Sequence, residues 1–171
     1  VAVAVPDVSH VTKPLEAVAE SKQAKSEWLQ HVKVHNGYYI VRSVKTGHFR
    51  LADKYWNIIS KPYEQIKGFR NTKLSFNSQY SVVRNNVKFG FIDLTGREIA
   101  SPQYAAARNF SNRLAAVKVG DKWGFINDRN EMAIEPQYDQ IVQDFFRETA
   151  VVAKKNRVMR INKKGEKLKK L

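Results

Sequence analysis

The sequence predicts a mainly β protein: an array of antiparallel three-stranded meander repeats with an N-terminal helix. After Gly37, short alternating runs rich in Val, Ile, Phe and Tyr are separated by Gly, Asn, Asp and Pro, which is typical of antiparallel strands. Two of these segments match at an offset of 34 residues, which indicates an internal repeat. A hydrophobic content of 43% is typical of a protein with a packed core.

Residues 1–36 form the first predicted unit, an extended lead-in followed by a helix over about 14–32. Pro14 suits the first turn of a helix, and Thr12 is a candidate cap. Apolar residues recur at three- and four-residue steps, at Leu15, Val18, Ala19, Ala24, Trp28, Leu29 and Val32. The narrow apolar stripe predicts that this helix lies against the rest of the chain or against a partner. Because the sequence begins at Val1, we expect that at least a Met upstream of it has been removed or omitted.

Two complete copies of a repeat follow one another. The run KFGFID at 88–93 matches KWGFIN at 122–127, and a proline follows nine residues after each run. A third recurring strand is LAAV at 114–117 and TAVV at 149–152. Each copy therefore predicts two strands of a hairpin, a connection and a third strand.

Altered copies flank the complete ones. The run HFRLAD at 48–53 is again followed by a proline after nine residues, and RVMRIN at 157–162 begins a half copy. Arg50 and Met159 replace the glycine of the run. We therefore divide the repeat domain, residues 37–171, into copies at about 48–87, 88–121 and 122–156 and a half copy at 157–171.

The recurring residues have predicted structural tasks. Alternation along the strand places Trp123 and Phe125 on one face and Gly124 and Ile126 on the other. The glycine lets a neighbouring backbone or ring approach closely, and the proline ends the second strand. The Asp or Asn after each run is predicted to bond to the backbone of a hairpin turn, with a metal or acid–base role as the minor alternative. The predicted repeat-core residues are Phe89, Gly90, Phe91, Pro102, Tyr104, Trp123, Gly124, Phe125, Pro136 and Tyr138.

The run KWGFIN, its turn, the strand with its proline and the Tyr and Phe that follow closely resemble the WG (or KWG) repeat family. The resemblance covers about 48–168 and is clearest over 88–156. It implies an all-β repeat array that acts as an interaction scaffold. It also implies a secreted, periplasmic or envelope-associated location in a bacterium, with an organelle as the alternative. The units could be arranged as an open solenoid or as a propeller-like stack, and with so few copies we favour the open stack.

The sequence offers no recognisable catalytic or cofactor motif. Because the chain has no cysteine, disulfides, Cys-based zinc sites, iron–sulfur clusters and thiol catalysis are excluded. No nucleophile elbow, P-loop, dinucleotide fingerprint or EF-hand loop occurs, and only carboxylates paired by folding stay open. His31 and His35 have the spacing of a metal pair on one helical turn but lack an acidic neighbour. No apolar run reaches the length of a membrane span. We expect a protein that is not an enzyme and has no cofactor, metal site or catalytic residue.

Basic charge is concentrated at the C-terminal end. The formal net charge is +14, and residues 154–171 contribute +8 of it because Glu166 is their one acid. The nine cations are Lys154, Lys155, Arg157, Arg160, Lys163, Lys164, Lys167, Lys169 and Lys170. A solvated terminus without a function is one interpretation. The other is contact with an anionic partner: first an acidic protein surface, second a nucleic acid in a ribonucleoprotein, with an anionic membrane surface as a further alternative. The segment has no aromatic residue for base stacking, which favours the protein partner.

Overall fold

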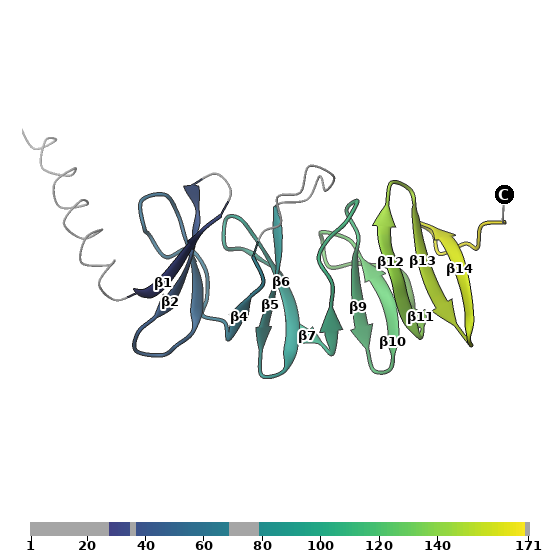
Figure 1. The fold of residues 1–171 in the computed structure, drawn as a ribbon, viewed down its shortest axis with the longest axis horizontal. Helices are drawn as coiled ribbons and strands as arrows, with labels where there is room; N and C mark the ends of the chain where they lie inside the picture. Colours follow the sequence, from purple (N-terminus) through teal and green to yellow (C-terminus); the bar gives the residue numbers. More distant parts are fainter. Residues whose placement is uncertain (1–27, 35–36, 69–78, 170–171) are drawn as a thin grey trace, which may run out of the picture.

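The computed structural model describes residues 28–34, 37–68 and 79–169. Figure 1 shows a row of four antiparallel β-sheets that runs from the N-terminal to the C-terminal end of these residues. The described part of the chain contains no α-helix, and its sheets do not close into a barrel. The predicted mainly β, antiparallel architecture is therefore confirmed.

Each sheet is an antiparallel meander of three or four strands. The first sheet contains β1 (Trp28–Lys33), β2 (Tyr39–Ser43) and β3 (Phe49–Ala52). The second contains β4 (Gln65–Ile66), β5 (Tyr80–Asn85), β6 (Lys88–Asp93) and β7 (Glu98–Tyr104). The third contains β8 (Ala106–Ala107), β9 (Ala115–Val119), β10 (Lys122–Ile126) and β11 (Met132–Tyr138). The fourth contains β12 (Gln140–Phe146), β13 (Thr149–Lys154) and β14 (Arg157–Asn162).

Three hydrophobic cores fill the spaces between the four sheets. Successive side chains on a strand point to opposite faces and therefore serve different cores. On β10, Trp123 and Phe125 pack towards the fourth sheet, whereas Ile126 packs towards the second. On β5, Val82 packs towards the third sheet and Val83 towards the first. The predicted alternation on β10 is confirmed, and the two central sheets are covered on both faces.

The sheets are out of phase with the copies of the repeat. The third strand of one copy forms hydrogen bonds with the first strand of the next, as where β9 pairs with β10 and Val117 lies opposite Gly124. Within a copy the chain crosses to the following sheet, with only Ala105 between β7 and β8 and only Asp139 between β11 and β12. The meander that we predicted within one copy is therefore assembled from two successive copies.

The predicted N-terminal helix is wrong at its C-terminal end. Residues 28–33 form β1, which pairs with β2 and places Val32 opposite Ile40 and Lys33 opposite Tyr39. Pairing with a neighbouring strand overrides the three- and four-residue apolar spacing, because propensity and local pattern are weak next to tertiary hydrogen bonds. The rest of that helix and the lead-in, residues 1–27, lie outside the described residues.

The glycine and the proline of each complete copy meet in one backbone contact. Gly124 alone faces a three-residue bulge of β11 that contains Pro136. A Cβ on Gly124 would lie 2.5 Å from the carbonyl oxygen of Ile134 and 2.8 Å from the nitrogen of Pro136. The same addition to Gly90 would lie 2.7 Å from the nitrogen of Pro102. The proline therefore does not end the second strand as predicted: it lies at a bulge, where the ladder needs no N–H.

The first copy lacks this contact. Arg50 replaces the glycine, and in place of a continuous second strand the described residues form isolated bridges. The N–H of Leu51 donates to the Ser60 hydroxyl at 2.7 Å, so a side chain substitutes for a backbone acceptor of the ladder. A side chain at position 50 is incompatible with the close bulge of the complete copies.

The Asp or Asn after each run closes a hairpin turn, as predicted. In every case the side-chain oxygen accepts hydrogen bonds from the backbone N–H groups two and four residues further on. The four residues are Asp53, Asp93, Asn127 and Asn162. The third residue after each has a positive φ, namely Trp56, Gly96, Asn130 and Gly165. These carboxylates and amides stabilise turns, which is the structural role expected of them.

A buried tyrosine from each complete copy bonds to the hairpin turn of the next. The Tyr104 hydroxyl donates to Asn130 Oδ1 at 2.6 Å, and the Tyr138 hydroxyl donates to the carbonyl oxygen of Gly165 at 3.3 Å. Burial raises the pKa of both phenols, so both are neutral donors at neutral pH. Neighbouring sheets are thus joined by hydrogen bonds as well as by apolar packing.

Tyr63 makes the corresponding link from the first copy to β7. Its hydroxyl donates to Glu98 Oε1 at 2.7 Å, and Lys61 Nζ lies 2.7 Å from Glu98 Oε2. Burial raises the pKa of Tyr63, and the bond to the Glu98 carboxylate raises it further. Burial alone would also raise the pKa of Glu98, but the hydrogen bonds from Lys61 and Tyr63 outweigh it and hold that pKa below its usual range.

The contact at Gly124 predicts a large loss of stability in Gly124→Ala. The added methyl group meets backbone atoms, so we expect a loss of about 3 kcal/mol in the free energy of unfolding, measured by urea denaturation. Gly120→Ala is the control, because a Cβ there meets nothing within 4 Å and only the φ of +56° is strained. That variant should lose about 1 kcal/mol. Equal losses in the two variants would contradict the bulge contact.

The junction at Glu98 predicts a specific dependence of stability on pH. Because the pKa of Glu98 is lower in the folded than in the unfolded chain, its contribution is present above the ordinary carboxyl range and is lost as the pH falls through the folded value. Glu98→Gln should therefore be less stable than the wild type at neutral pH and should lose less stability on acidification, measured by urea denaturation at several pH values. The control Glu135→Gln, at an exposed position of β11, should retain the wild-type slope. If Glu98→Gln loses as much unfolding free energy on acidification as the wild type does, the Glu98 carboxylate is not the source of this pH dependence.

Candidate functional site

The predicted repeat-core residues are all in or beside the cores between the sheets. Phe91, Tyr104, Phe125 and Tyr138 are buried, and Phe89 and Trp123 pack against the same cores while remaining half-buried. The Phe125 ring meets Phe145 edge-on at 4.9 Å between centroids. The glycines and prolines form the bulge contacts described above. These residues hold the sheets together, so a contact surface has to come from exposed residues.

The eight predicted contact cations that the structure describes do not form one patch. Lys154, Lys155 and Arg157 lie at the hairpin between β13 and β14. Lys154 Nζ donates to Gln137 Oε1 at 2.8 Å, and the Lys155 N–H donates to Asp139 Oδ2 at 2.7 Å. This end of the sheet is therefore tied to the corner between β11 and β12.

A second group of cations lies at the other end of β14. Lys163 and Lys164 belong to the turn closed by Asn162, and Lys163 Nζ lies 3.0 Å from Glu148 Oε1. Lys164 is exposed. Lys170 lies outside the described residues.

The third group, Arg160, Lys167 and Lys169, surrounds a groove. After β14 the chain turns back, so that Lys167 lies opposite Ile161 and the Leu168 N–H donates to the carbonyl oxygen of Arg160 at 2.9 Å. The groove has a volume of about 750 Å³, and we call it the C-terminal groove. It is lined by Val151, Val158, Met159, Arg160, Lys167, Leu168 and Lys169.

The sequence analysis found the cations of this groove but missed its apolar residues. Val158 is 66% exposed on β14, although it occupies the position of Trp123 in the repeat. The replacement of two aromatic residues of the run by Val158 and Arg160 was the available signal. Only the fold shows that Leu168 joins them, because a turn brings it back beside the strand.

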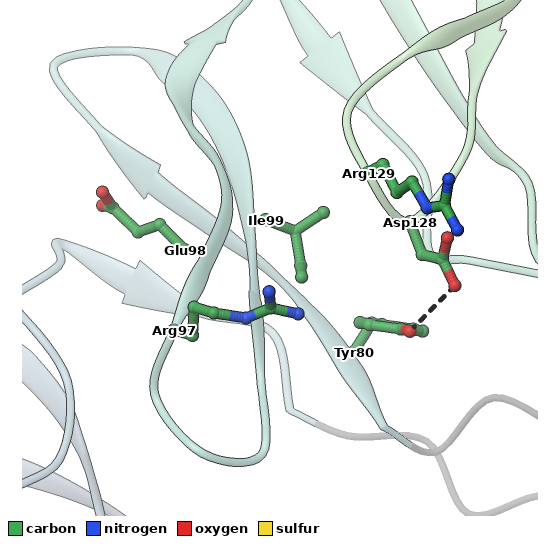
Figure 2. A pocket seen from close by; sticks show the side chains of 6 residues that line it. All are labelled: Tyr80, Arg97, Glu98, Ile99, Asp128 and Arg129. Atoms are coloured by element: carbon green, nitrogen blue, oxygen red, sulfur yellow. Dashed lines mark hydrogen bonds between the residues drawn. The ribbon is translucent and has the colours of Figure 1, made fainter.

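A second, polar pocket lies at the junction of the second and third sheets and has a volume of about 410 Å³. Figure 2 shows the side chains that line it. It is lined by Tyr80, Arg97, Glu98, Ile99, Asp128 and Arg129. The Tyr80 hydroxyl donates to Asp128 Oδ2 at 3.3 Å, and Arg97 Nε lies 3.1 Å from Asp93 Oδ2. Burial raises the pKa of Tyr80, and Asp128 raises it further. The bond from Tyr80 on β5 to Asp128 in the hairpin turn after β10 joins the second sheet to the third.

The described residues offer neither a metal-ligand cluster nor a membrane-spanning helix. No group of three or more His, Cys, Asp or Glu side chains in the described part of the chain is arranged to hold a metal ion. Within the same residues, no helix has the length and apolarity needed to cross a bilayer.

Comparison with known proteins identifies the repeat. The family described as "WG containing repeat" matches the chain twice, at residues 89–123 and 123–157. No curated protein matches the sequence. The solved structure titled "KlHsv2 with loop 6CD replaced by a Gly-Ser linker" has a TM-score of 0.48 and 9% sequence identity, over 79% of this chain and 49% of that one. The present chain thus spans about half the length of that chain, and a likeness of this extent carries no argument about function.

The two family matches cover the two copies in which the glycine–proline bulge and the link from tyrosine to the next turn are complete. The resemblance inferred from the run KWGFIN is confirmed there. The family model thus matches two adjacent WG-containing repeats, at residues 89–157.

Proposed function

We propose that the chain is a non-enzymatic interaction scaffold, or an accessory subunit of a larger assembly. The repeat array binds a protein partner, and the basic C-terminal end contacts an acidic surface. The observation that carries this proposal is the fourth sheet, which exposes the apolar residues Val142, Phe146 and Val158 and also the cations Arg147, Arg157 and Arg160. Exposed apolar residues grouped with charge are typical of a protein contact surface.

The arrangement of the array supports the same proposal. The residues that define the repeat are used to build cores, whereas hairpins and strand edges remain along the row of sheets (Figure 1). Such an elongated stack offers partners a long surface in proportion to its size, as in other repeat proteins. We further propose a bacterial secreted, periplasmic or envelope-associated setting, which rests on the resemblance to WG repeat proteins.

Association with nucleic acid is the second candidate function. The formal net charge of +14 favours it. The division of the C-terminal cations into three groups disfavours it, because a nucleic-acid backbone is best followed by a continuous basic stripe. Residues of the C-terminal groove also include no aromatic side chain for base stacking.

The proposal predicts a stoichiometric protein partner whose binding depends on the C-terminal cations. The immobilised full chain should capture this partner from a nuclease-treated extract of its source organism at about 50 mM salt, and high salt should release it because surface charges are then screened. The triple variant Lys164→Glu, Lys167→Glu, Lys169→Glu should lose most of the captured protein. The control Lys45→Glu, Lys54→Glu, Lys88→Glu changes the charge equally on the first two sheets and should retain it.

Two outcomes would count against the scaffold. A chain that stays free of any stoichiometric protein at low salt would contradict it. Capture that disappears on nuclease treatment, with a steep loss of RNA or DNA binding as salt rises, would favour the nucleic-acid function.

A further inference from the structure

The outer face of the fourth sheet is apolar, yet no other described sheet covers it. On β12, Ile141 and Phe145 point into the core shared with the third sheet. Phe146 lies opposite Thr149, the neighbour of the core residue Ala150, and therefore faces away from that core. Val142 and Phe146 are 49% and 47% exposed. On β13, Val151 lies between two core residues and therefore faces the same way. Each of the first three sheets instead has its corresponding face covered by the next sheet.

This face differs in sequence from the same face of the third sheet. In the third sheet, Phe125 lies opposite Ala116 and is 1% exposed against the fourth sheet. In the fourth sheet, Arg160 stands at the position of Phe125 and lies opposite Val151. A further sheet of the same kind would bury the Arg160 guanidinium without a partner, which costs free energy. A partner that buries this guanidinium needs an acceptor for it, and a carboxylate is a well-matched one.

The C-terminal groove combines apolar and cationic groups in a small area. Val151, Val158 and Leu168 provide its apolar lining, and Arg160, Lys167 and Lys169 provide its charge. No carboxylate is among its described lining residues. The nearby Glu166 is directed elsewhere, since its Oε2 accepts a hydrogen bond from Asn162 Nδ2 at 2.7 Å. The potential in the groove is therefore positive.

We infer that the C-terminal groove is the docking site for an acidic peptide segment of a partner protein. Leu- or Val-type side chains of the segment pack on Val151, Val158 and Leu168, and its Asp or Glu side chains pair with the surrounding cations. This inference rests on the proposed scaffold function and names the surface and the chemistry of the partner. A second copy of the chain fits less well, because the same +8 of charge at residues 154–171 would meet itself.

A labelled peptide tests the assignment directly. The probe is a fluorescein-labelled peptide of three Asp-Leu-Glu-Val units, titrated with the full chain and followed by fluorescence anisotropy at low salt. One control peptide has Ser in place of Leu and Val, and the other has Lys in place of Asp and Glu. We expect the acidic apolar peptide to bind at least about tenfold more tightly than either control, because only it satisfies both halves of the groove.

Matched variants locate the binding site on the chain. Val158→Asp with Arg160→Glu should weaken binding of the probe at least about tenfold. The control Val87→Asp with Lys88→Glu makes the same chemical and charge changes at the exposed β5–β6 hairpin and should leave the affinity within about twofold. Both positions of the groove variant are exposed, and an unchanged melting temperature shows that the fold is retained.

Several results would overturn the assignment. One is failure of the probe to bind the wild-type chain at about 1 mM, and another is equal binding of the probe by the groove variant and the wild type. A third is a groove variant that still binds the peptide probe but no longer binds oligo-uridine, tested as a nucleic-acid probe. Concentration-dependent dimerisation that the groove variant abolishes would also overturn it, since a second copy would then occupy the face. If the groove variant still captures the stoichiometric partner, the groove assignment fails and the scaffold stands. If the probe binds the groove but no such partner is captured, the groove assignment stands and the scaffold fails.

Discussion

The pairing of each copy's last strand with the first strand of the next copy organises this protein. Because β9 belongs to one copy and β10 to the next, no copy of the repeat forms a complete sheet by itself. The chain then crosses to the following sheet through a single residue, Ala105 between β7 and β8 and Asp139 between β11 and β12. Hydrogen bonds between strands therefore join successive copies within one sheet, whereas the chain itself joins one sheet to the next. The hydrophobic cores are enclosed between neighbouring sheets.

The recurring residues of the repeat serve this arrangement. The glycine permits the bulge of the second strand, and the bulge turns that strand towards the crossing at its end. Next, the tyrosine before the crossing bonds to the turn of the following hairpin, and the Asp or Asn of that turn fixes its shape. Met159 and Arg50 stand where the glycine is lost. The segment opposite Met159 pairs without a bulge, and the segment opposite Arg50 pairs only through isolated bridges, with two extra residues between them against three in the complete copies.

Local chemistry made much of this fold predictable from the sequence. The turns at Asp93 and Asn127 and the two faces of β10 follow from side-chain hydrogen bonding and strand alternation, which act within a few residues. The sequence did not predict which strands of successive copies share a sheet, because the repeat has the same period whichever residue is taken as its start. The strand β1 was missed because its partner β2, and not its own spacing, determines its structure. In the groove, the charge of Arg160 was visible in the sequence, whereas the position of Leu168 depends on a chain reversal.

The offset between copies and sheets has a consequence for the order in which the protein is made. During synthesis, the N-terminal end of the chain leaves the ribosome first, and folding can begin before the rest has been made. When residues 88–121 have emerged, β9 has no β10 to pair with until the next copy follows. A growing chain therefore always carries one incomplete sheet at its newest end, with an exposed strand edge that is open to wrong pairing. Each new copy closes the edge left by the previous one and opens another.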